Sequence, residues 1–494
     1  MSGIRQELKI AGTVCLDYQI WHARGFCTFF DQNMKESERE MAEQDYIGKL
    51  IENARAAQAV LTTYSQEQID TLVRAIGKTV FDHAAELAEM AVAETGMGSV
   101  KDKIAKNQGK ARMIWYDLKT KKSVGVLAEY PEKGIIEVAK PIGVIASVTP
   151  CTNPVVTPMC NAMFAVKCAN TIIVAPHPRA KKLTTYLSSL WNKALSELGA
   201  PENVIQVIGE PSLNLTDELM HSADAVIATG GGSMVKAAYS SGKPSFGVGP
   251  GNVQCIFDRG VNIPEAVAET LAGRTFDNGI ICAGEQTVIA PREQYDEIMG
   301  EFQRQGAVYI DDKAKIEQIR EELFPNGKIN AKLVGHSLQE VLGTAGVEVP
   351  EEAKLAILAV DTAGENELLS KEKMFPIMTA YRYDTWDDAI EIAKSNLAVE
   401  GKGHSVSIRS NDYEHILEVG KRVDVSRVVV NQICSTSAGG SFKNGLNPTT
   451  TIGCGSWGNN SISENLTYYH LMNRIRIAMV KPGWYQPTDE EIWG

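Results

Sequence analysis

The sequence predicts an α/β protein built from parallel sheets that carry helices on both faces. Apolar runs alternate with helical patterns between residues 143 and 228, and a second alternating block runs from about Gly247 to Asn431. Strands without polar alternation are typical of parallel sheets that are buried on both sides. The chain has 494 residues, 44% of them hydrophobic and 22% charged, which is enough for two or three domains.

The segment that precedes the first sheet is predicted to be helical. Apolar residues recur at helical spacing from Tyr46 onward. Ser65 and Gln68 form a capping box at the start of the next helix, and a third helix, from about Asp82, ends near Gly96. These helices are expected to pack against the sheet.

A β-hairpin is predicted over residues 122–140, where two extended runs flank a turn at Tyr130–Gly134. Because an exposed hairpin needs its edge covered, we expect it to contact another subunit. The tail, 432–494, is rich in small polar residues before a piece at Ser463–Arg476 that we expect to be helical.

Four apolar runs predict the first sheet, and each ends in a distinctive loop. Ligands of parallel sheets bind at the carboxyl ends of strands, so these loops are the candidate binding residues. The expected strands are 143–148, 171–175, 204–208 and 225–228, with helices at 158–167 and 181–198. In the second block we expect helices at 295–305 and 386–396 and strands at 354–360 and 427–431.

Composition excludes several classes of function. The net charge of −12 does not favour nucleic acid or an anionic membrane surface, and no apolar run is long enough to cross a membrane. Met1–Gly12 lacks the pattern of a secretory signal, and the nine cysteines form no CxxC pair, which is typical of a reduced cytoplasmic protein. The chain has no HExxH, no P-loop and no metal-type cluster, so we expect no metal.

Cys282 is the candidate nucleophile. It follows the turn-forming pair Asn278-Gly279 and two isoleucines, and small residues come after it, so the thiol is expected at a bend beside a cleft. The alternative is a small residue of the hydrophobic core, which is the usual place of a free cysteine.

Three strand ends carry further candidates, each with a structural alternative. Thr229-Gly230-Gly231 opens a helix where glycines admit the phosphates of a dinucleotide, or is a tight turn. Asn153 can donate its amide to an oxyanion, or form an Asx-turn before Pro154. His177, which lies between two prolines, can meet an adenine or a phosphate, or belong to a surface turn.

Taken together, six stretches resemble the CoA-acylating branch of the aldehyde dehydrogenase superfamily. The resemblance covers roughly residues 45–494 and is closest to the group that acts on succinate semialdehyde. It extends to the aldehyde dehydrogenase half of bifunctional aldehyde-alcohol dehydrogenases. The stretches are 149–154, 175–181, 228–232, 247–252, 278–282 and 453–458.

The resemblance implies the roles of individual residues and of whole segments. Cys282 is expected to be the nucleophile and Asn153 the oxyanion donor. The cofactor-binding residues are then Pro150, His177, Pro178, Thr229, Gly230, Gly231 and Glu372. The implied domains are an extension of unknown role (1–44), a Rossmann-type nucleotide-binding domain (45–246, including the hairpin 122–140), a catalytic thiol domain (247–431) and a segment that returns to the first domain or to a partner subunit (432–494).

Gly247 predicts how the reaction ends. Hydrolytic members of the family have a water-activating glutamate where this chain has Gly247. A positioned base contributes roughly 10²–10⁴ in rate, so water is expected to be a poor acceptor of the acyl group. A thiol ionises more readily, so coenzyme A is the expected acceptor. We therefore expect no carboxylate poised to activate water beside Cys282.

The expected reaction joins a short aldehyde, coenzyme A and NAD or NADP in a cytoplasmic homodimer or higher oligomer. Succinate semialdehyde is the favoured substrate, and sulfoacetaldehyde and acetaldehyde are alternatives. Arg274 and the loop 435–440 are candidates for meeting an anionic tail. A hydrolytic dehydrogenase and an inactive scaffold subunit are competing hypotheses. A cysteine hydrolase is disfavoured because no histidine has a suggestive placement.

Overall fold

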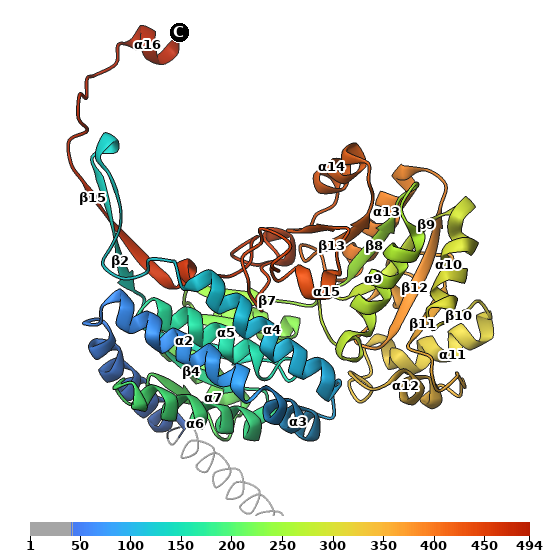
Figure 1. The fold of residues 1–494 in the computed structure, drawn as a ribbon, viewed down its shortest axis with the longest axis horizontal. Coiled ribbons are helices and arrows are strands. Elements are labelled where there is room, and N and C mark those ends of the chain that lie inside the picture. Colours follow the sequence, from blue (N-terminus) through green and yellow to red (C-terminus); the bar gives the residue numbers. More distant parts are fainter. Residues whose placement is uncertain (1–40, 42) are drawn as a thin grey trace, which may run out of the picture.

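The structure is a computed structural model that describes residue 41 and residues 43–494. Two α/β bodies lie side by side, and a long arm extends from the first of them toward the carboxyl terminus (Figure 1). Nearly all of the predicted extension, 1–44, lies outside the described residues. In the described part of the chain, no helix is both long and apolar enough to cross a membrane.

The first body is a parallel five-stranded sheet with the order β5-β4-β3-β6-β7. Four of its strands coincide with the predicted runs, which confirms the parallel sheet. The bounds are β3 Val144–Thr149, β4 Thr171–Pro176, β5 Ile205–Val207, β6 Ala225–Thr229 and β7 Ser245–Val248. β7 spans the expected boundary at residue 246 and belongs to this sheet.

Alternate strand residues of this sheet face opposite layers of helices. Ile145 and Ile172 enter one apolar cluster, while Val144 and Ile173 enter another. The first layer holds α2 Gln66–Asp82, α3 Ala84–Thr95, α4 Val100–Leu118, α5 Val156–Lys167 and α6 Lys181–Glu197. The second holds the helical residues 43–61, α7 Leu213–Ser222 and α8 Gly232–Ser240.

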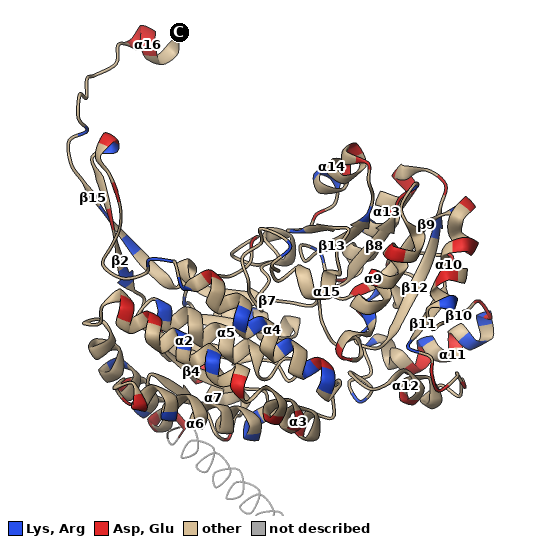
Figure 2. Cartoon of the chain, in the orientation of Figure 1, with Lys and Arg blue, Asp and Glu red and all other residues tan. Residues whose placement is uncertain are grey.

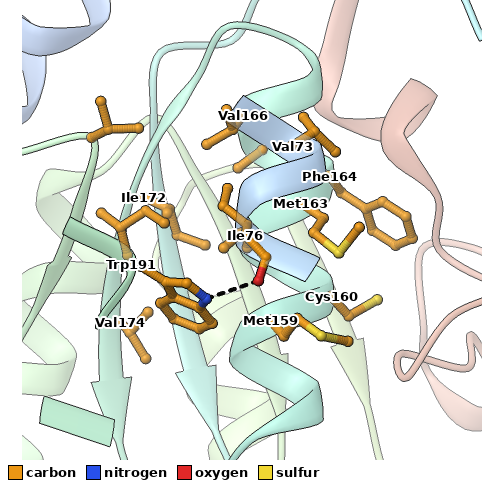
Figure 3. Packing of buried hydrophobic residues seen from close by; sticks show 14 of the residues in the cluster. Val73, Ile76, Met159, Cys160, Met163, Phe164, Val166, Ile172, Val174 and Trp191 are labelled. Atoms are coloured by element: carbon orange, nitrogen blue, oxygen red, sulfur yellow. Dashed lines mark hydrogen bonds between the residues drawn. The ribbon is translucent and has the colours of Figure 1, made fainter. Parts of the chain in front are cut away.

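Trp191 anchors the first layer of helices. Its ring is fully buried beside Ile172 and Val174 of β4, and its indole N–H donates to the carbonyl oxygen of Ile76 in α2 at 3.1 Å (Figure 3). A buried Trp needs such a partner for its N–H. The bond therefore fixes α6 against α2 while the ring fills the space above the sheet.

Helix ends in this layer largely follow the local sequence signals. Ser65 and Gln68 form the predicted capping box of α2, and α3 ends at Gly96 in the left-handed conformation. The sequence did not predict α4, which begins at the N-cap Ser99. Its inward positions include Lys103 and Asn107, so the apolar stripe that marks a helix is broken there.

The second body is a parallel seven-stranded sheet with the order β10-β11-β12-β9-β8-β13-β14. Helices again cover both faces. The strands are β8 Val253–Phe257, β9 Glu285–Pro291, β10 Ala307–Ile310, β11 Leu355–Ala359, β12 Ile377–Tyr383, β13 Val406–Arg409 and β14 Val428–Val430. The helices are α9 Ile263–Thr275, α10 Tyr295–Arg304, α11 Lys313–Leu323, α12 Leu338–Thr344, α13 Trp386–Val399, α14 Tyr413–Arg422 and α15 Cys434–Ser437.

The arm is an antiparallel sheet of β1 (Val126–Tyr130), β2 (Ile135–Pro141) and β15 (Met472–Ala478). The predicted hairpin is present, and the chain's own tail covers the free edge of β2. The helix predicted over Ser463–Arg476 was wrong, because Met472–Ala478 is a strand. Ile475 and Ile477 alternate with arginines there, a period-two pattern, and pairing with β2 supplies the hydrogen bonds. A short helix, α16 (Asp489–Trp493), ends the chain.

Candidate active site

Cys282 lies in a strained turn between α9 and β9. Asp277, Asn278 and Gly279 all have positive φ, between 53° and 74°. Such a conformation costs of order 1–3 kcal/mol for each residue other than glycine, so the surrounding structure must stabilise it. At Gly279 a Cβ would lie 2.4 Å from the carbonyl oxygen of Phe375, so only glycine fits there.

Asp277 fixes this turn to the start of α4. Its carboxylate accepts the N–H of Ser99 at 2.9 Å and the ammonium groups of Lys103 at 3.0 Å and Lys106 at 2.6 Å. Its own N–H donates to Asp102 at 2.9 Å. Burial alone would raise the pKa of Asp277, but the two lysines outweigh it and keep that pKa below its ordinary value. A charged, buried carboxylate therefore holds the turn before Cys282 in place.

The glycine loop after β7 contacts the cysteine itself. A Cβ on Gly251 would lie 2.0 Å from the carbonyl oxygen of Cys282, so the two backbones touch. The N–H of Gly251 donates to the carboxyl group of Glu372 at 3.0 Å. Burial, followed by the charges of Glu372 and Cys454, raises the pKa of Cys282 to about 12, although Arg427 acts in the opposite direction. In this state the thiol is protonated at neutral pH.

Lys106 orients the amide of Asn153. Its ammonium donates to the Asn153 Oδ1 at 2.7 Å while it also binds Asp277. Because the carbonyl end of the amide is occupied, the NH₂ end is free to donate elsewhere. Asn153 and Cys282 line the same two cavities, so this amide can reach an oxygen that develops near the sulfur.

The larger cavity, of about 550 Å³, lies at the carboxyl ends of β3, β4 and β6. All nine residues proposed from the sequence line it: Pro150, Asn153, His177, Pro178, Thr229, Gly230, Gly231, Cys282 and Glu372. The structure thus brings together residues that are up to 222 positions apart in the chain.

This cavity fits a dinucleotide at the amino end of α8. The hydroxyl of Thr229 is buried without a hydrogen-bond partner in the described structure, and a Cβ on Gly231 would project into open space. The first amides of a helix have no partner within the helix, and its dipole favours an anion there. Phosphate oxygens can therefore approach the backbone at Gly231, with the Thr229 hydroxyl beside them.

Glu372 is the one acidic residue among those that line the larger cavity. Burial first, and then the neighbouring Glu400, raises the pKa of Glu372 to about 8, despite the hydrogen bond from Gly251. The carboxyl group is therefore largely protonated at neutral pH. It shares the cavity with Cys282, so it is the residue to test as a competing base.

The position at which a water-activating glutamate would stand is filled by other side chains. A Cβ on Gly247 would lie 2.7 Å from Val235 and 2.9 Å from the ring of Tyr239. The Tyr239 hydroxyl accepts the N–H groups of Gly247 and Ser461, each at 3.0 Å. No longer side chain fits at residue 247 unless this packing moves.

A smaller cavity, of about 220 Å³, is also lined by Cys282. It is lined by α4, by the loop after β14 and by the segment 449–452. Lys106 and Lys110 are its two charged residues. Neither lysine was predicted from the sequence, because α4 itself was not predicted, although Ser99 and Asp102 carry the signature of a helix start.

The two candidates for meeting an anionic tail, Arg274 and the loop 435–440, have different outcomes. Arg274 does not reach either cavity, because it is fully buried and donates to the main-chain carbonyls of Lys373, Phe375 and Ile377. The proposal that it meets a substrate anion is therefore wrong. The loop 435–440 does contribute Ser435, Thr436 and Gly439 to the smaller cavity.

The stretch 453–458, whose contacts the sequence could not predict, lies near Cys282, because Cys454 and Arg427 both act on the pKa of the Cys282 thiol. Gly403 approaches Cys454 so closely that a Cβ would lie 1.9 Å from its carbonyl oxygen. Arg427 donates to the carbonyls of Gly453 and His404. The His404 ring is fully buried, both of its nitrogens lack a partner among the described residues, and burial lowers its pKa to about 3.

Residue 41 and residues 43–494 contain no group of three or more His, Cys, Asp and Glu side chains that could hold a metal.

Comparison with known proteins identifies close relatives. Residues 33–315 match the model of the aldehyde dehydrogenase family. The chain is 53% identical over 454 residues to succinate-semialdehyde dehydrogenase (acetylating) of Clostridium kluyveri, covering 92% of this chain and 100% of that protein. It is 39% identical to sulfoacetaldehyde dehydrogenase of an Acholeplasma species, covering 90% and 93% of the two chains.

Solved structures agree with the fold. An acetylating aldehyde dehydrogenase from Geobacillus thermoglucosidasius superimposes with a TM-score of 0.87 at 35% identity, covering 91% of this chain and 99% of that one. Propionaldehyde dehydrogenase of Rhodopseudomonas palustris, solved with bound CoA and an acylated cysteine, gives 0.78 at 28% identity over 88% and 97%. An engineered glycolyl-CoA reductase with bound NADP⁺ gives 0.79 at 28% over the same shares.

Proposed function

The chain belongs to the aldehyde dehydrogenase family, in its CoA-acylating branch, and we propose that it interconverts succinate semialdehyde and succinyl-CoA through a thioester on Cys282. The reaction consumes aldehyde, CoA and an oxidised nicotinamide dinucleotide and gives acyl-CoA, the reduced dinucleotide and a proton. Relatives have been solved with NADP⁺ bound and with CoA bound, and we propose that this chain uses NAD or NADP as cofactor and CoA as co-substrate.

One observation carries the proposed mechanism: Cys282 lines two cavities, which also share Asn153 and Thr450. The larger cavity has the features of a dinucleotide groove, and the smaller one holds two lysines. Cys282 and Asn153 belong to both. An aldehyde carbon bound to the Cys282 sulfur would therefore face a nicotinamide in the larger cavity, while the rest of the substrate lies in the smaller cavity.

In the first step the Cys282 thiol releases its proton to solvent and its Sγ forms a bond to the aldehyde carbon. The carbonyl oxygen gains a negative charge, which the Asn153 amide can stabilise because Lys106 holds its carbonyl end. Removing one oxyanion donor typically costs about 10²–10³ in kcat. A nicotinamide bound in the larger cavity supplies the acceptor for the hydride that leaves this carbon. The product is a thioester on Cys282.

In the second step the CoA thiol loses its proton and its sulfur bonds to the acyl carbon, the bond to the Cys282 sulfur breaks, and the leaving Cys282 thiolate takes up a proton. The packing of Tyr239 and Val235 against Gly247 supports this acceptor, because it excludes a carboxylate from the place of the family's water-activating base. A CoA thiol needs less activation than water, since it ionises far more readily.

A specific observation favours one competing function. Glu372 lines the cavity of Cys282, and a carboxyl group with a pKa of about 8 can act as a general base near neutral pH. If it activated water, the enzyme would release succinate. We favour a cofactor-binding role for Glu372, because one of its carboxyl oxygens already accepts the N–H of Gly251.

The test follows the reduced dinucleotide formed from succinate semialdehyde with and without CoA, and identifies the product by mass spectrometry. We expect sustained turnover only with CoA, succinyl-CoA as product, and no activity in Cys282→Ala. Equal turnover without CoA, with succinate as product, would reject acyl transfer to CoA. Glu372→Gln then separates the roles: loss of a base abolishes succinate formation, whereas loss of a cofactor ligand raises the KM for the dinucleotide.

We further propose that the arm joins two copies of the chain in the cytoplasm. Ile475 and Ile477 of β15 are 46% and 47% exposed, which is unusual for isoleucines of a sheet. A second copy packed on this strand would bury them. Light scattering after gel filtration checks the dimer, and Ile475→Lys is expected to weaken it.

A further inference from the structure

The smaller cavity beside Cys282 contains more positive than negative charge. Lys106 and Lys110 of α4 line it, and Figure 2 shows basic residues recurring along this helix. Asp277 is the carboxylate bound to Lys103 and to Lys106. Lys110 forms no ion pair in the described structure, and its ammonium donates instead to the carbonyls of Gly439 at 3.0 Å and Thr449 at 3.1 Å. Its charge is therefore not neutralised.

The Lys110 ammonium has one N–H donor more than the described structure uses. Lys has three N–H donors, and two of them are accounted for by the carbonyl groups. Burial lowers the pKa of Lys110 to about 8, which reflects the missing counter-charge. An anion in the cavity would neutralise the ammonium and accept its third hydrogen bond.

Two hydroxyl groups that line the same cavity have unused hydrogen-bonding capacity. The Ser435 Oγ is buried with no hydrogen bond in the described structure, and the buried Thr450 Oγ1 contacts the Cys160 thiol and has no nitrogen or oxygen partner there. Buried hydroxyls in proteins are normally satisfied, so each exception calls for a partner that the chain itself does not supply. One ammonium and two hydroxyls around a cavity form a suitable site for the oxygens of an anion.

The size of the cavity limits the anion. A volume of about 220 Å³ lies below the range of about 300–1,000 Å³ that holds drug-sized ligands, so only a short molecule fits. Cys282 is on the cavity wall and receives the aldehyde end in the proposed reaction. The opposite end of the same molecule then faces Lys110.

We propose that Lys110, with the hydroxyls of Ser435 and Thr450, binds a terminal carboxylate or sulfonate and so selects short aldehydes that carry an anionic tail. This inference rests on the proposed function, since it assumes that the aldehyde binds at Cys282. Lys110 is a specificity-determining residue here, whereas Lys106 is committed to Asp277 and Asn153. The positive charge that binds the anionic tail is thus that of Lys110 on α4 and not that of Arg274.

The test compares aldehydes of similar length with and without an anionic end. We would measure kcat/KM with CoA for succinate semialdehyde, sulfoacetaldehyde and butanal in the wild type, Lys110→Met and Lys110→Arg. A charged hydrogen bond lost from a buried site changes affinity by about 10- to 100-fold. We expect Lys110→Met to lower the ratio of anionic to neutral kcat/KM by that factor, mainly through KM, and Lys110→Arg to restore part of it.

Lys101→Met is the matched control, because Lys101 is an exposed lysine of the same helix and lines neither cavity. Its selectivity ratio should stay within about threefold of the wild type if distant charge matters little. An equal loss on all three aldehydes in Lys110→Met would mean that the lysine only supports the loops, and would overturn the proposal. The faster of the two anionic substrates identifies the tail as carboxylate or sulfonate.

A second measurement needs no variant. Succinate, but not butyramide at the same concentration, should slow the alkylation of Cys282 in the wild type by iodoacetamide. The protection should weaken as the pH rises through about 8, where Lys110 loses its proton. The titratable groups that face Lys110 are Lys106 of α4, Cys160 of α5 and Cys282, and of these Lys106 carries a positive charge. Equal protection by butyramide would overturn the anion site.

The outcome also distinguishes this inference from the proposed function. A wild type that makes no acyl-CoA from any aldehyde refutes the function. A wild type that makes acyl-CoA but prefers butanal to both anionic aldehydes refutes the selection by Lys110 and leaves the function intact.

Discussion

Gly251→Ala is the sharpest test of how the nucleophile is held. The added Cβ would lie 2.0 Å from the carbonyl oxygen of Cys282, whereas ordinary contact begins near 3.4 Å, so one backbone must move by about 1.4 Å. A misplacement of about 1 Å at a reacting group can cost about 10²-fold in rate. Overpacking a close contact typically costs about 1–3 kcal/mol of stability. We therefore expect kcat/KM to fall at least about 10²-fold in a protein that still folds.

The assay is CoA-dependent formation of reduced dinucleotide, together with a thermal melt of each variant. Gly209→Ala is the control, because Gly209 also lies in a loop after a strand and an added Cβ there meets nothing within 4 Å. A Gly251→Ala enzyme with kcat/KM within about threefold of the wild type and an unchanged Tm would refute the reasoning, since a 1.4 Å shift cannot be absorbed without consequence.

Three further predictions follow from the same contacts. Lys106→Met frees the Asn153 carbonyl oxygen, so we expect kcat to fall by up to about 10²-fold with an unchanged KM for CoA, measured by steady-state kinetics. Glu372→Gln removes the charge that raises the pKa of Cys282, so above about pH 8, where Glu372 is ionised, iodoacetamide should alkylate Cys282 faster in the variant, and an equal or slower rate would contradict this sign. Trp191→Ala removes a buried ring and its bond to Ile76, so stability should fall by about 3–5 kcal/mol in urea denaturation, while a loss below about 1 kcal/mol would contradict its place as an anchor.

The sequence predicted the elements whose signal is local. Apolar runs such as 171–175 gave strands of the first sheet, and the capping box at Ser65 gave the start of α2. The helix predicted over Ser463–Arg476 failed because β15 takes its hydrogen bonds from β2, more than 330 residues earlier. Such pairing cannot be deduced from neighbouring residues, although the alternation of Ile475 and Ile477 with arginines was visible.

The candidate site divides in the same way. Residues at strand ends, such as Thr229 and Asn153, were accessible from the sequence because parallel strands present their carboxyl ends to one cavity. Lys106 and Lys110 were not, since they lie on α4, whose inward face carries Lys103 and Asn107 in place of apolar residues. The helix is polar there because it holds the charged turn at Asp277. The polar inward face that holds this turn is therefore also the reason that α4 lacks the apolar periodicity by which a helix is predicted.

A buried thiol with a raised pKa appears unsuited to nucleophilic attack, and the surroundings of Cys282 explain how it can still react. Burial keeps the sulfur protonated in the protein alone, and above about pH 8, where Glu372 is ionised, the charge of Glu372 adds to this effect, which protects the thiol from unwanted chemistry. Binding of the cofactor would weaken the effects that keep the thiol protonated. A cation beside the sulfur favours the thiolate, and a ligand that binds Glu372 in the larger cavity shields the charge of its carboxylate. The thiol would then ionise only when the cofactor is bound. Reactivity of Cys282 toward iodoacetamide should therefore rise on addition of the oxidised dinucleotide, and above about pH 8, where Glu372 is ionised, Glu372→Gln should reduce the size of that increase, because part of the shift in the pKa of Cys282 has already been made. An increase of unchanged size would show that Glu372 has no part in controlling the nucleophile.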